Sequence, residues 1–216
     1  MGRAKDIIIK VIPSKIANDF IRKNHYSGKV MLGSRLHFGC FLNNMLHGVM
    51  SFGNPIDKRK VKGLVKNTKW NEMLELNRLA FDRYLPRNSE SRCLSIAFKL
   101  IKKNAPHIKW ILSFADGCQC GDGTIYRASG FYLVGIKKNS TIYEMPSGEK
   151  IAKHGTSKKN TTFAKKLPGF QIKYIYLLDK SCKLTVPVLP FSKIDELGAG
   201  MYKGEKITVK ERHKRL

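Results

Sequence analysis

Hydrophobic positions near the start of the chain change from the spacing of a strand to that of a helix. Residues 5–12 are rich in β-branched side chains and predict a strand. A helix should begin at Pro13-Ser14 and end near residues 24–28, because apolar side chains recur there every three or four residues. These side chains are Ile16, Ala17, Phe20 and Ile21. Their spacing predicts a helix with one buried face.

Two strands joined by a tight turn should follow this helix. They are expected at residues 35–42 and 45–52, and Asn43-Asn44 between them favours a hairpin turn. Gly53-Asn54-Pro55 then ends the pattern. Residues 57–70, with the sequence DKRKVKGLVKNTKW, predict a basic insertion.

Strands and helices alternate in the next part of the chain. Strands are expected at 73–81, 108–115 and 131–136, separated by a helix that ends near Asn104 and a short helix over 123–129. The run 108–115 is almost wholly apolar, which is typical of a central strand covered on both faces. This order predicts an α/β fold with a mixed central sheet flanked by helices.

The chain becomes polar and basic beyond Glu149, which predicts a loop before a last strand near 171–178. The length suits one domain with a core of ordinary size. We therefore expect a catalytic domain over residues 1–180. A basic extension over 181–216 should pack on this domain or trail from it.

The net charge points to a polyanionic partner. Lys and Arg number 41 against 16 acidic residues, a formal charge of +25, which is far more than solubility requires. Nucleic acid fits best, because release of counterions from phosphates supplies affinity. A ribosomal or membrane-surface role stays open at this point.

The protein should be cytoplasmic. A membrane-spanning helix needs about 20 consecutive apolar residues, and the chain has no such stretch; its first apolar run is also too short for a signal peptide. The five cysteines lack the spacing of a disulfide framework and are expected to be free thiols. Cys118 and Cys120 resemble a metal-binding pair, but no second pair completes a zinc site.

Two charged residues in strands are candidate site residues. Asp116 ends the apolar strand, where open α/β sheets bind ligands, although it could equally start a turn. Strict alternation over 73–81 places Arg78 on the apolar face and Glu75 on the opposite face. A half-buried guanidinium needs an anion, and Asp116, Asp82 or a ligand phosphate could supply it.

The segment between the strand at 73–81 and the following helix is a candidate phosphate site. Free backbone N–H groups at the start of a helix bind phosphates. Here these would be the N–H groups of Asn88, Ser89 and Ser91, and Arg87 would add a positive charge beside them. No glycine is present there, and an ordinary helix cap by Asn88 or Ser89 explains the same residues. His25, Tyr26 and Tyr126 carry weaker signals, and Tyr126 by itself would be expected in the core.

Five strings of residues resemble the Mom family of phage DNA-modification proteins in wording, order and spacing. They are Asn24-His25-Tyr26-Ser27-Gly28, Phe52-Gly53-Asn54-Pro55, Glu75-Leu76-Asn77-Arg78-Leu79, Ser113-Phe114-Ala115-Asp116 and Gly123-Thr124-Ile125-Tyr126-Arg127-Ala128-Ser129. The resemblance covers residues 5–136. The loop after 149 and the basic tail carry no matching motif.

The resemblance implies a GNAT-like acetyltransferase fold that converts adenine in duplex DNA to an N6-carbamoylmethyl form and protects phage DNA from host restriction. It implies acetyl-CoA as cofactor, with Arg78 and Tyr126 at positions tied to that cofactor. Tyr26 and Asp116 match positions tied to catalysis, with His25 beside them. The departure is the pyrophosphate loop, where GNAT enzymes typically have glycines and this chain has Arg87-Asn88-Ser89.

The implied product makes iron a candidate cofactor. Joining adenine N6 to the methyl carbon of an acetyl unit is not ordinary acyl transfer, because the carbonyl carbon is the electrophile. A metal with open coordination positions supports oxidative or radical steps. The candidate ligands are His25, Tyr26 and Asp116.

Two other functions stay open: a plain acetyl-CoA-dependent N-acetyltransferase and a non-catalytic nucleic-acid-binding protein. For a DNA-modifying enzyme, the duplex backbone should be held by residues 58–69, 150–166 and 203–215. The protein should be a monomer or a homodimer.

Overall fold

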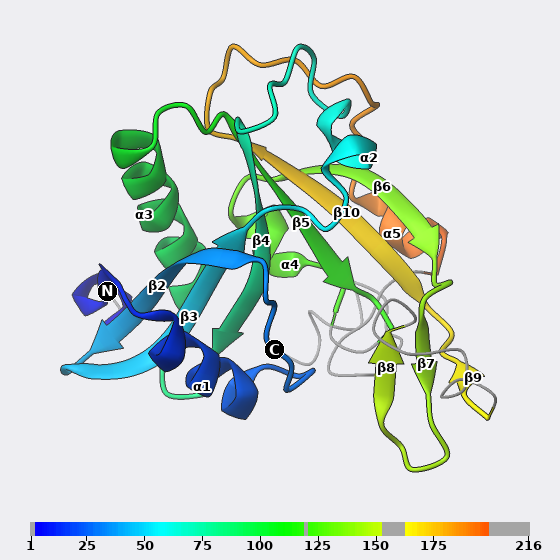
Figure 1. Ribbon diagram of the computed structural model, residues 1–216, viewed down its shortest axis with the longest axis horizontal. Coiled ribbons are helices and arrows are strands. Elements are labelled where there is room, and N and C mark those ends of the chain that lie inside the picture. Colours follow the sequence, from blue (N-terminus) through cyan, green and yellow to red (C-terminus); the bar gives the residue numbers. More distant parts are fainter. Residues whose placement is uncertain (1–2, 119–120, 153–162, 199–216) are drawn as a thin grey trace. The chain divides into compact units, whose positions relative to one another are not determined.

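The computed structural model describes residues 3–118, 121–152 and 163–198 (Figure 1). The chain forms two compact units, and each is described by itself. The first unit comprises residues 1–113, 125–132 and 174–188, and the remaining residues form the second unit. All but one of the candidate site residues, Asp116, belong to the first unit.

A mixed sheet of seven strands is the main feature of the fold. Its order is β1-β2-β3-β4-β5-β10-β6. The bounds are β1 (Ile8–Val11), β2 (Ser34–Leu42), β3 (Met45–Gly53), β4 (Met73–Phe81), β5 (Trp110–Asp116), β10 (Phe170–Leu177) and β6 (Tyr132–Lys138). Strands β1 to β4 pair antiparallel, and β4 pairs parallel with β5. The predicted α/β class with a mixed sheet is confirmed.

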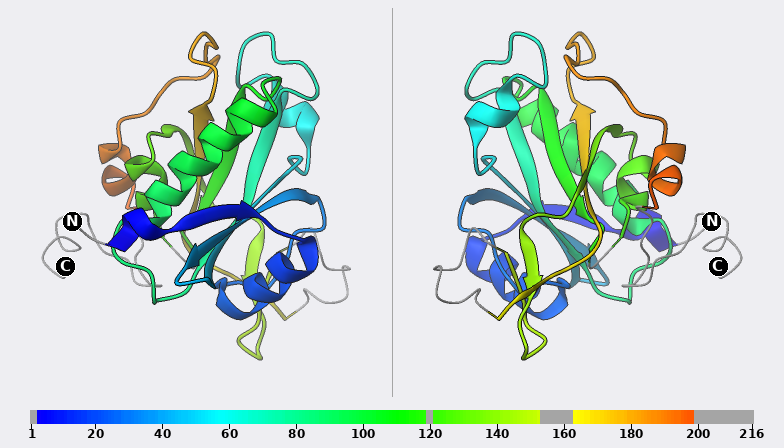
Figure 2. Two further views of the ribbon diagram at one scale, coloured as in Figure 1. Left: turned by 90° about the vertical axis from the view of Figure 1, so that its left-hand side faces the viewer. Right: turned by 90° about the vertical axis from the view of Figure 1, so that its right-hand side faces the viewer.

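The helices are η1 (Arg3–Asp6), α1 (Ser14–Asn24), α2 (Lys58–Lys62), α3 (Ser89–Asn104), α4 (Thr124–Ala128) and α5 (Ser192–Glu196). Within the first unit, α1 and α3 lie on opposite faces of the sheet (Figure 2). Alternation along β3 explains which helix covers which face. Val49 packs with Ala17 and Ile21 of α1, whereas Phe52 points to the other face and contacts Phe98 of α3.

The predicted hairpin between β2 and β3 is confirmed. Asn43 and Asn44 both adopt positive φ angles, of 51° and 62°. A two-residue turn with this backbone matches the twist of the two strands, and Asn tolerates it better than most residues. The turn thereby fixes the register of β2 against β3.

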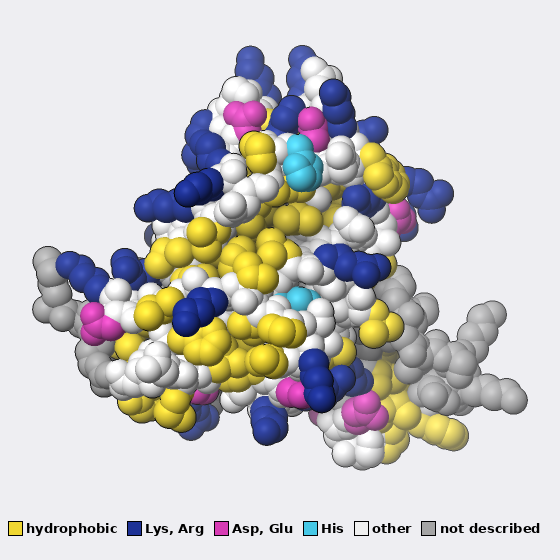
Figure 3. Space-filling model, turned by 60° about the vertical axis from the view of Figure 1, so that its left-hand side comes forward, with side chains coloured by type: hydrophobic (Ala, Val, Ile, Leu, Met, Phe, Trp, Pro, Cys, Tyr) yellow, Lys and Arg dark blue, Asp and Glu magenta, His cyan; other side chains and the backbone are white. Residues whose placement is uncertain are grey.

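The basic insertion between β3 and β4 contains the short helix α2 and is tied to a second loop of the same unit. Lys66 N–H donates to Lys183 O at 2.8 Å, and Thr185 N–H donates to Leu64 O at 3.0 Å. Figure 3 shows Lys and Arg side chains gathered at the upper end of the view, over these loops.

The second unit contains a small three-stranded sheet in the order β8-β7-β9. Its strands are β7 (Ile142–Glu144), β8 (Lys150–Ala152) and β9 (Lys165–Lys166). The sequence predicted a loop beyond Glu149, which is wrong for β8 and β9. Strands of two or three residues carry too little alternation to be recognised, and here the Asn139 amide ties the sheet together by donating to Ile142 O and Leu167 O.

Several predictions concern residues that the structure leaves untested. The boundary at residue 180 stays a prediction, and the tail at 203–215, Cys120 and most of the loop at 150–166 lie outside the described residues. The described cysteines Cys40, Cys93, Cys118 and Cys182 are free thiols. Within the described residues, no helix is both long and apolar enough to cross a bilayer.

Candidate active site

A β-bulge in β4 determines which side chains share the candidate site. Ser51 of β3 lies opposite Arg78, but the next residue, Phe52, lies opposite Leu76. Asn77 is therefore an extra residue, as in a β-bulge. The bulge shifts the alternation of β4 by one position.

This shift brings Glu75 and Arg78 to the same face of the sheet. Arg78 pairs with Ser51 and Glu75 pairs with Gly53, and residues two apart on β3 face the same side. Strict alternation had placed Glu75 and Arg78 on opposite faces, and that prediction is wrong because it assumed a regular strand.

Two hydrogen bonds orient the Arg78 guanidinium. Its Nε donates to Lys29 O at 2.7 Å, and Nη1 donates to Asn77 O at 2.7 Å. Burial lowers the pKa of Arg78, while Tyr26, Glu75 and Tyr126 oppose this shift electrostatically. Arg78 is thus a half-buried cation surrounded by these three side chains.

Glu75 is a buried carboxyl group whose charge is costly. Glu75 is 9% exposed. Burial raises the pKa of its carboxyl group to about 7, although Asn77 and Arg78 each act to lower that pKa. A carboxyl group with a pKa near neutrality exchanges its proton readily at physiological pH. Glu75 is therefore a candidate general base.

His25 and Tyr26 lie in the turn that ends α1. Gly28 closes the turn with a φ of 59° and donates its N–H to His25 O at 2.9 Å. This backbone conformation is the reason for a glycine at that position. The rings of His25 and Tyr26 lie 4.2 Å apart, and Tyr26 is 50% exposed.

His25 is a neutral hydrogen-bond donor at neutral pH. Burial lowers its pKa to about 4, and the Arg78 charge contributes to the shift. The Ser27 N–H donates to His25 Nδ1 at 3.2 Å, so the ring proton must reside on Nε2. His25 can therefore donate to a ligand through Nε2.

Tyr126 combines the two roles that the sequence left open. It is 9% exposed, and its ring contacts those of Phe131 and Tyr174 at 5.2 Å and 5.1 Å. The expectation that it would be a core residue is correct. It also lies close enough to Arg78 to affect the pKa of that residue.

The edge of β4 facing β5 is paired over a short length. The pairs are Met73 with Trp110, Leu74 with Ile111 and Glu75 with Leu112. From Leu76 to Phe81 the strand pairs with β3 alone among the described residues. Backbone N–H and C=O groups on that edge can therefore bind an extended ligand.

An open cavity of about 540 Å³ lies where β4 leads into α3. Its walls come from the start of the chain, the first turns of α3 and the end of α4. They are Ala4, Lys5, Arg87, Asn88, Ser91, Arg92, Ser95, Ala128 and Ser129. Three cationic side chains and a helix N-terminus suit a phosphate-containing ligand.

The predicted phosphate residues differ in their placement. Arg87, Asn88 and Ser91 line the cavity. Ser89 is 1% exposed, and its hydroxyl donates to Pro86 O, so its side chain stabilises the turn. Asn88 precedes the helix with a φ of 66° and makes no side-chain cap, so the alternative of an Asn88 side-chain cap is wrong.

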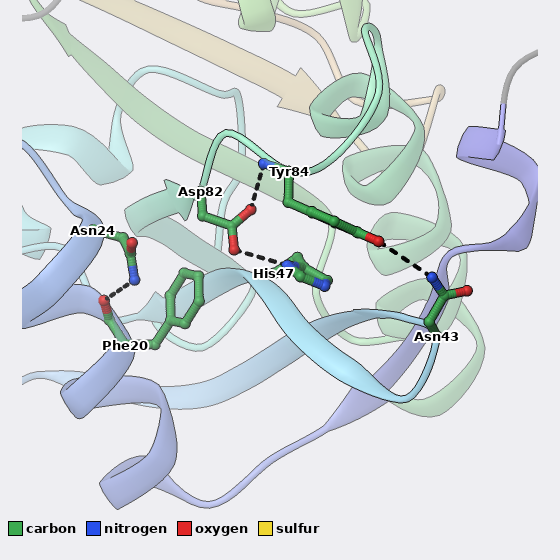
Figure 4. Close-up of polar contacts among 6 residues, drawn as sticks. All are labelled: Phe20, Asn24, Asn43, His47, Asp82 and Tyr84. Atoms are coloured by element: carbon green, nitrogen blue, oxygen red, sulfur yellow. Dashed lines mark hydrogen bonds and ion pairs between the residues drawn. The ribbon is translucent and has the colours of Figure 1, made fainter.

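A second polar cluster fixes the start of the β4–α3 loop (Figure 4). His47 Nδ1 lies 2.8 Å from Asp82 Oδ2, and Tyr84 N–H donates to Asp82 Oδ1 at 2.9 Å. The Tyr84 ring stacks on His47 at 4.2 Å, and Asn43 donates to the Tyr84 hydroxyl at 3.3 Å. Asp82 therefore pairs with His47 and not, as one alternative had it, with Arg78.

Asp116 lies in the second unit and is part of a turn. Its Oδ1 accepts a hydrogen bond from Cys118 N–H at 2.9 Å, as the turn interpretation of the sequence required. Burial and Asp116 together raise the pKa of Cys118 to about 12, so this thiol stays protonated. The catalytic roles of Asp116 and Tyr26 stay predictions.

The described residues give no support to the iron site that the sequence suggested. They contain no group of three His, Cys, Asp or Glu side chains that could hold a metal ion.

Sequence reasoning missed Glu75 and Asn77 as site residues. Both are buried, at 9% and 7% exposure, and Ser34 donates to Asn77 Oδ1 at 3.0 Å. The available signal was a Glu within a largely apolar strand, because buried carboxyl groups are rare without a function or a partner.

Comparison with known proteins identifies the family. The model of the Mom protein family matches residues 6–193. The chain belongs to the Mom family. The methylcarbamoylase Mom of Escherichia phage Mu is 36% identical over 143 residues, which are 66% of this chain and 58% of that relative. The chain thus spans less than two thirds of this Mom protein.

Solved structures show the fold of this Mom family member. The spermidine/spermine N-acetyltransferase SpeG from Vibrio cholerae, solved with manganese ions, has a TM-score of 0.52 and 7% identity, covering 83% of this chain and 97% of its own. A GNAT acetyltransferase from Elizabethkingia anophelis with bound acetyl-CoA has a TM-score of 0.47 and 14% identity, covering 80% and 98%. The predicted GNAT-like fold is confirmed.

Proposed function

We propose that this Mom family protein is a DNA-modifying transferase that converts adenine to an N6-carbamoylmethyl form and thereby protects phage DNA from restriction. The family match over residues 6–193 carries the proposal. The site at the β4 bulge supplies groups suited to it, namely a buried carboxyl group, an oriented guanidinium and a neutral imidazole.

Glu75 is the proposed base for the adenine amine. Any new bond to N6 requires that the amine lose a proton, and a carboxylate with a pKa of about 7 can accept it. His25 would donate through Nε2 to the target base or to the group transferred. Tyr26 and Asp116 stay candidate catalytic residues on the strength of their family motifs.

Acetyl-CoA is the proposed cofactor. Its phosphates would occupy the cavity lined by Arg87, Asn88 and Ser91, and its extended arm would pair with the edge of β4 that β5 leaves unpaired beyond Glu75. Arg78 and Tyr126 would then adjoin the acyl end. Three cationic residues in the cavity offset the lack of a glycine-rich loop.

Duplex DNA is the proposed substrate, and the host cytoplasm the proposed compartment. The charge of +25 supplies affinity for phosphates. Because N6 is paired inside the duplex, the target base must leave the stack, at a cost of a few kcal/mol that phosphate contacts can offset.

Nucleoside mass spectrometry tests this function. DNA from cells that express the protein should contain N6-carbamoylmethyl deoxyadenosine, and DNA from cells carrying an empty vector should not. Acetylated protein or polyamine with unmodified DNA would instead identify a plain N-acetyltransferase, the function of similarly folded proteins. DNA binding without either product would indicate a non-catalytic binder.

Replacing Arg87 with Ala should weaken acetyl-CoA binding by about tenfold or more, because a hydrogen bond to a charged group contributes about 1.5–3 kcal/mol. Isothermal titration calorimetry with acetyl-CoA measures the loss. Arg78→Ala should also weaken binding, since Arg78 adjoins the proposed acyl end.

Lys99→Ala is the matched control for Arg87→Ala. Lys99 is exposed on α3 and does not line the cavity, so Lys99→Ala removes one positive charge without changing the cavity wall. Equal affinity for the parent and Arg87→Ala would show that the cavity does not hold the phosphates.

A further inference from the structure

The insertion between β3 and β4, residues 54–72, presents a basic surface that the proposed catalytic chemistry does not use. It contains six Lys or Arg residues and two acidic residues. Of the two acidic residues, Asp57 is paired with Lys60 at 3.3 Å and Glu72 with Lys109 at 3.0 Å. The remaining positive charge is largely exposed.

A tight turn at the end of the insertion presents Trp70 to solvent. Glu72 N–H donates to Lys69 O at 3.3 Å, and Lys69 N–H donates to Glu72 Oε2 at 2.8 Å. Trp70 lies between these residues and is 55% exposed. The turn is also tied to the residue that precedes β5, because Lys109 N–H donates to Glu72 O at 2.7 Å. A large aromatic side chain is thus held outward on a restrained turn.

Lys58 holds Trp70 from the other side of the insertion. Its Nζ lies 5.3 Å from the centre of the Trp70 ring and donates to Trp70 O at 2.9 Å. A cation over an indole ring stabilises that arrangement by about 0.5–1 kcal/mol at an exposed site. The pair therefore combines a positive charge with an exposed aromatic surface.

The position of Trp70 along the chain relates it to the site. Trp70 precedes Glu75 by five residues, a span of at most roughly 17 Å in extended chain. The cavity proposed to hold the phosphates is lined by Arg87, which follows the opposite end of β4. The insertion adjoins the end of β4 that is farther from the cavity. A large substrate that approaches Glu75 from that end would contact the insertion first.

We propose that Trp70 and Lys58 form a contact for duplex DNA beside the target adenine, with Trp70 stacking on a base or sugar and Lys58 binding a phosphate. This proposal rests on the proposed function, because it concerns how the same active site binds its DNA substrate. Basic charge selects a polyanion, and aromatic stacking is the usual apolar contact to nucleic acid. DNA distorted by extrusion of one base exposes the faces on which an indole can stack.

Tryptophan fluorescence isolates this contact. The chain has two Trp residues, and the other, Trp110, is fully buried and donates to Thr68. Addition of an adenine-containing duplex oligonucleotide should quench the emission of the parent protein, and Trp70→Phe should abolish this quenching. Trp70→Ala should weaken duplex binding by about 5- to 100-fold, the range expected for loss of one stacked base.

Val11→Ala is the matched control, because Val11 is an apolar residue 66% exposed on the edge strand β1. It should bind duplex DNA like the parent. If the parent binds and modifies DNA and Trp70→Ala does both equally well, the contact is wrong and the proposed function stands. If the parent binds no duplex DNA, both are wrong. Quenching by single-stranded DNA alone would overturn the duplex assignment.

Discussion

Replacing Glu75 with Gln should lower the rate of adenine modification by about 100- to 10,000-fold, the usual contribution of a positioned general base. Gln has nearly the shape of Glu but cannot accept the N6 proton. In the parent protein the rate should rise as pH increases through about 7, because the Glu75 carboxyl group must be ionised to act as a base. Initial rates of modification on a duplex oligonucleotide measure both effects.

The same substitution should make the protein more stable above neutral pH. Burial raises the Glu75 pKa from 4.5 to about 7, so between these values the unfolded chain releases a proton that the folded protein keeps. The free energy of unfolding therefore falls as pH rises through this range and stays low above it. Gln removes this penalty and should add up to about 3 kcal/mol at pH 8.

Glu196→Gln provides the control, because Glu196 is exposed and paired with Lys193. It should leave the rate of modification unchanged. A Glu75→Gln protein that is fully active would rule out the proposed base. One that loses activity and also stability at pH 8 would show that Glu75 is a structural residue.

Replacing Gly53 with Ala should destabilise the protein by about 3 kcal/mol, the upper part of the usual range for overpacking. An added Cβ would lie 2.2 Å from Gly33 O and 2.7 Å from Asn77 Oδ1. The first of these is a backbone atom and cannot rotate away. Gly53 also pairs with Glu75, so the change should disturb the site. Thermal and urea unfolding measure the effect on stability.

Gly63→Ala is the matched control for this prediction. Gly63 has a helical φ of −70°, and an added Cβ would meet no atom within 4 Å. Its stability should change little or increase slightly, because Ala restricts the unfolded chain. Equal stability of Gly53→Ala and the parent would show that β3 and the Gly33 segment are farther apart than described.

The sequence alone determined the long helices and most strands of the seven-stranded sheet. The predicted strand at 73–81 matches β4, and the helix predicted to end near Asn104 does so. These elements have long apolar patterns and clear turn residues at their ends, so local physics is sufficient to specify them. The short strands β8 and β9 lack such patterns and were missed.

Local sequence also indicated much of the candidate site. His25 and Arg78 are close enough for the Arg78 charge to lower the His25 pKa, and Arg87 lines the cavity. Arg87 was found because it lies at the end of an element, Arg78 because it carries a charge within a largely apolar strand, and His25 through its family motif. Such positions are visible in the order of residues along the chain.

Tertiary structure decided which of these groups can act together. The bulge at Asn77 moves Glu75 to the face of Arg78, and burial in the folded protein raises the pKa of Glu75 to about 7. The position of Glu75 and its pKa both depend on strand pairing and on packing between residues that are far apart in the chain. No single residue in the sequence specifies that pairing or packing. Register and burial are properties of the assembled sheet, and they determine the direction of a side chain and the pKa of its carboxyl group.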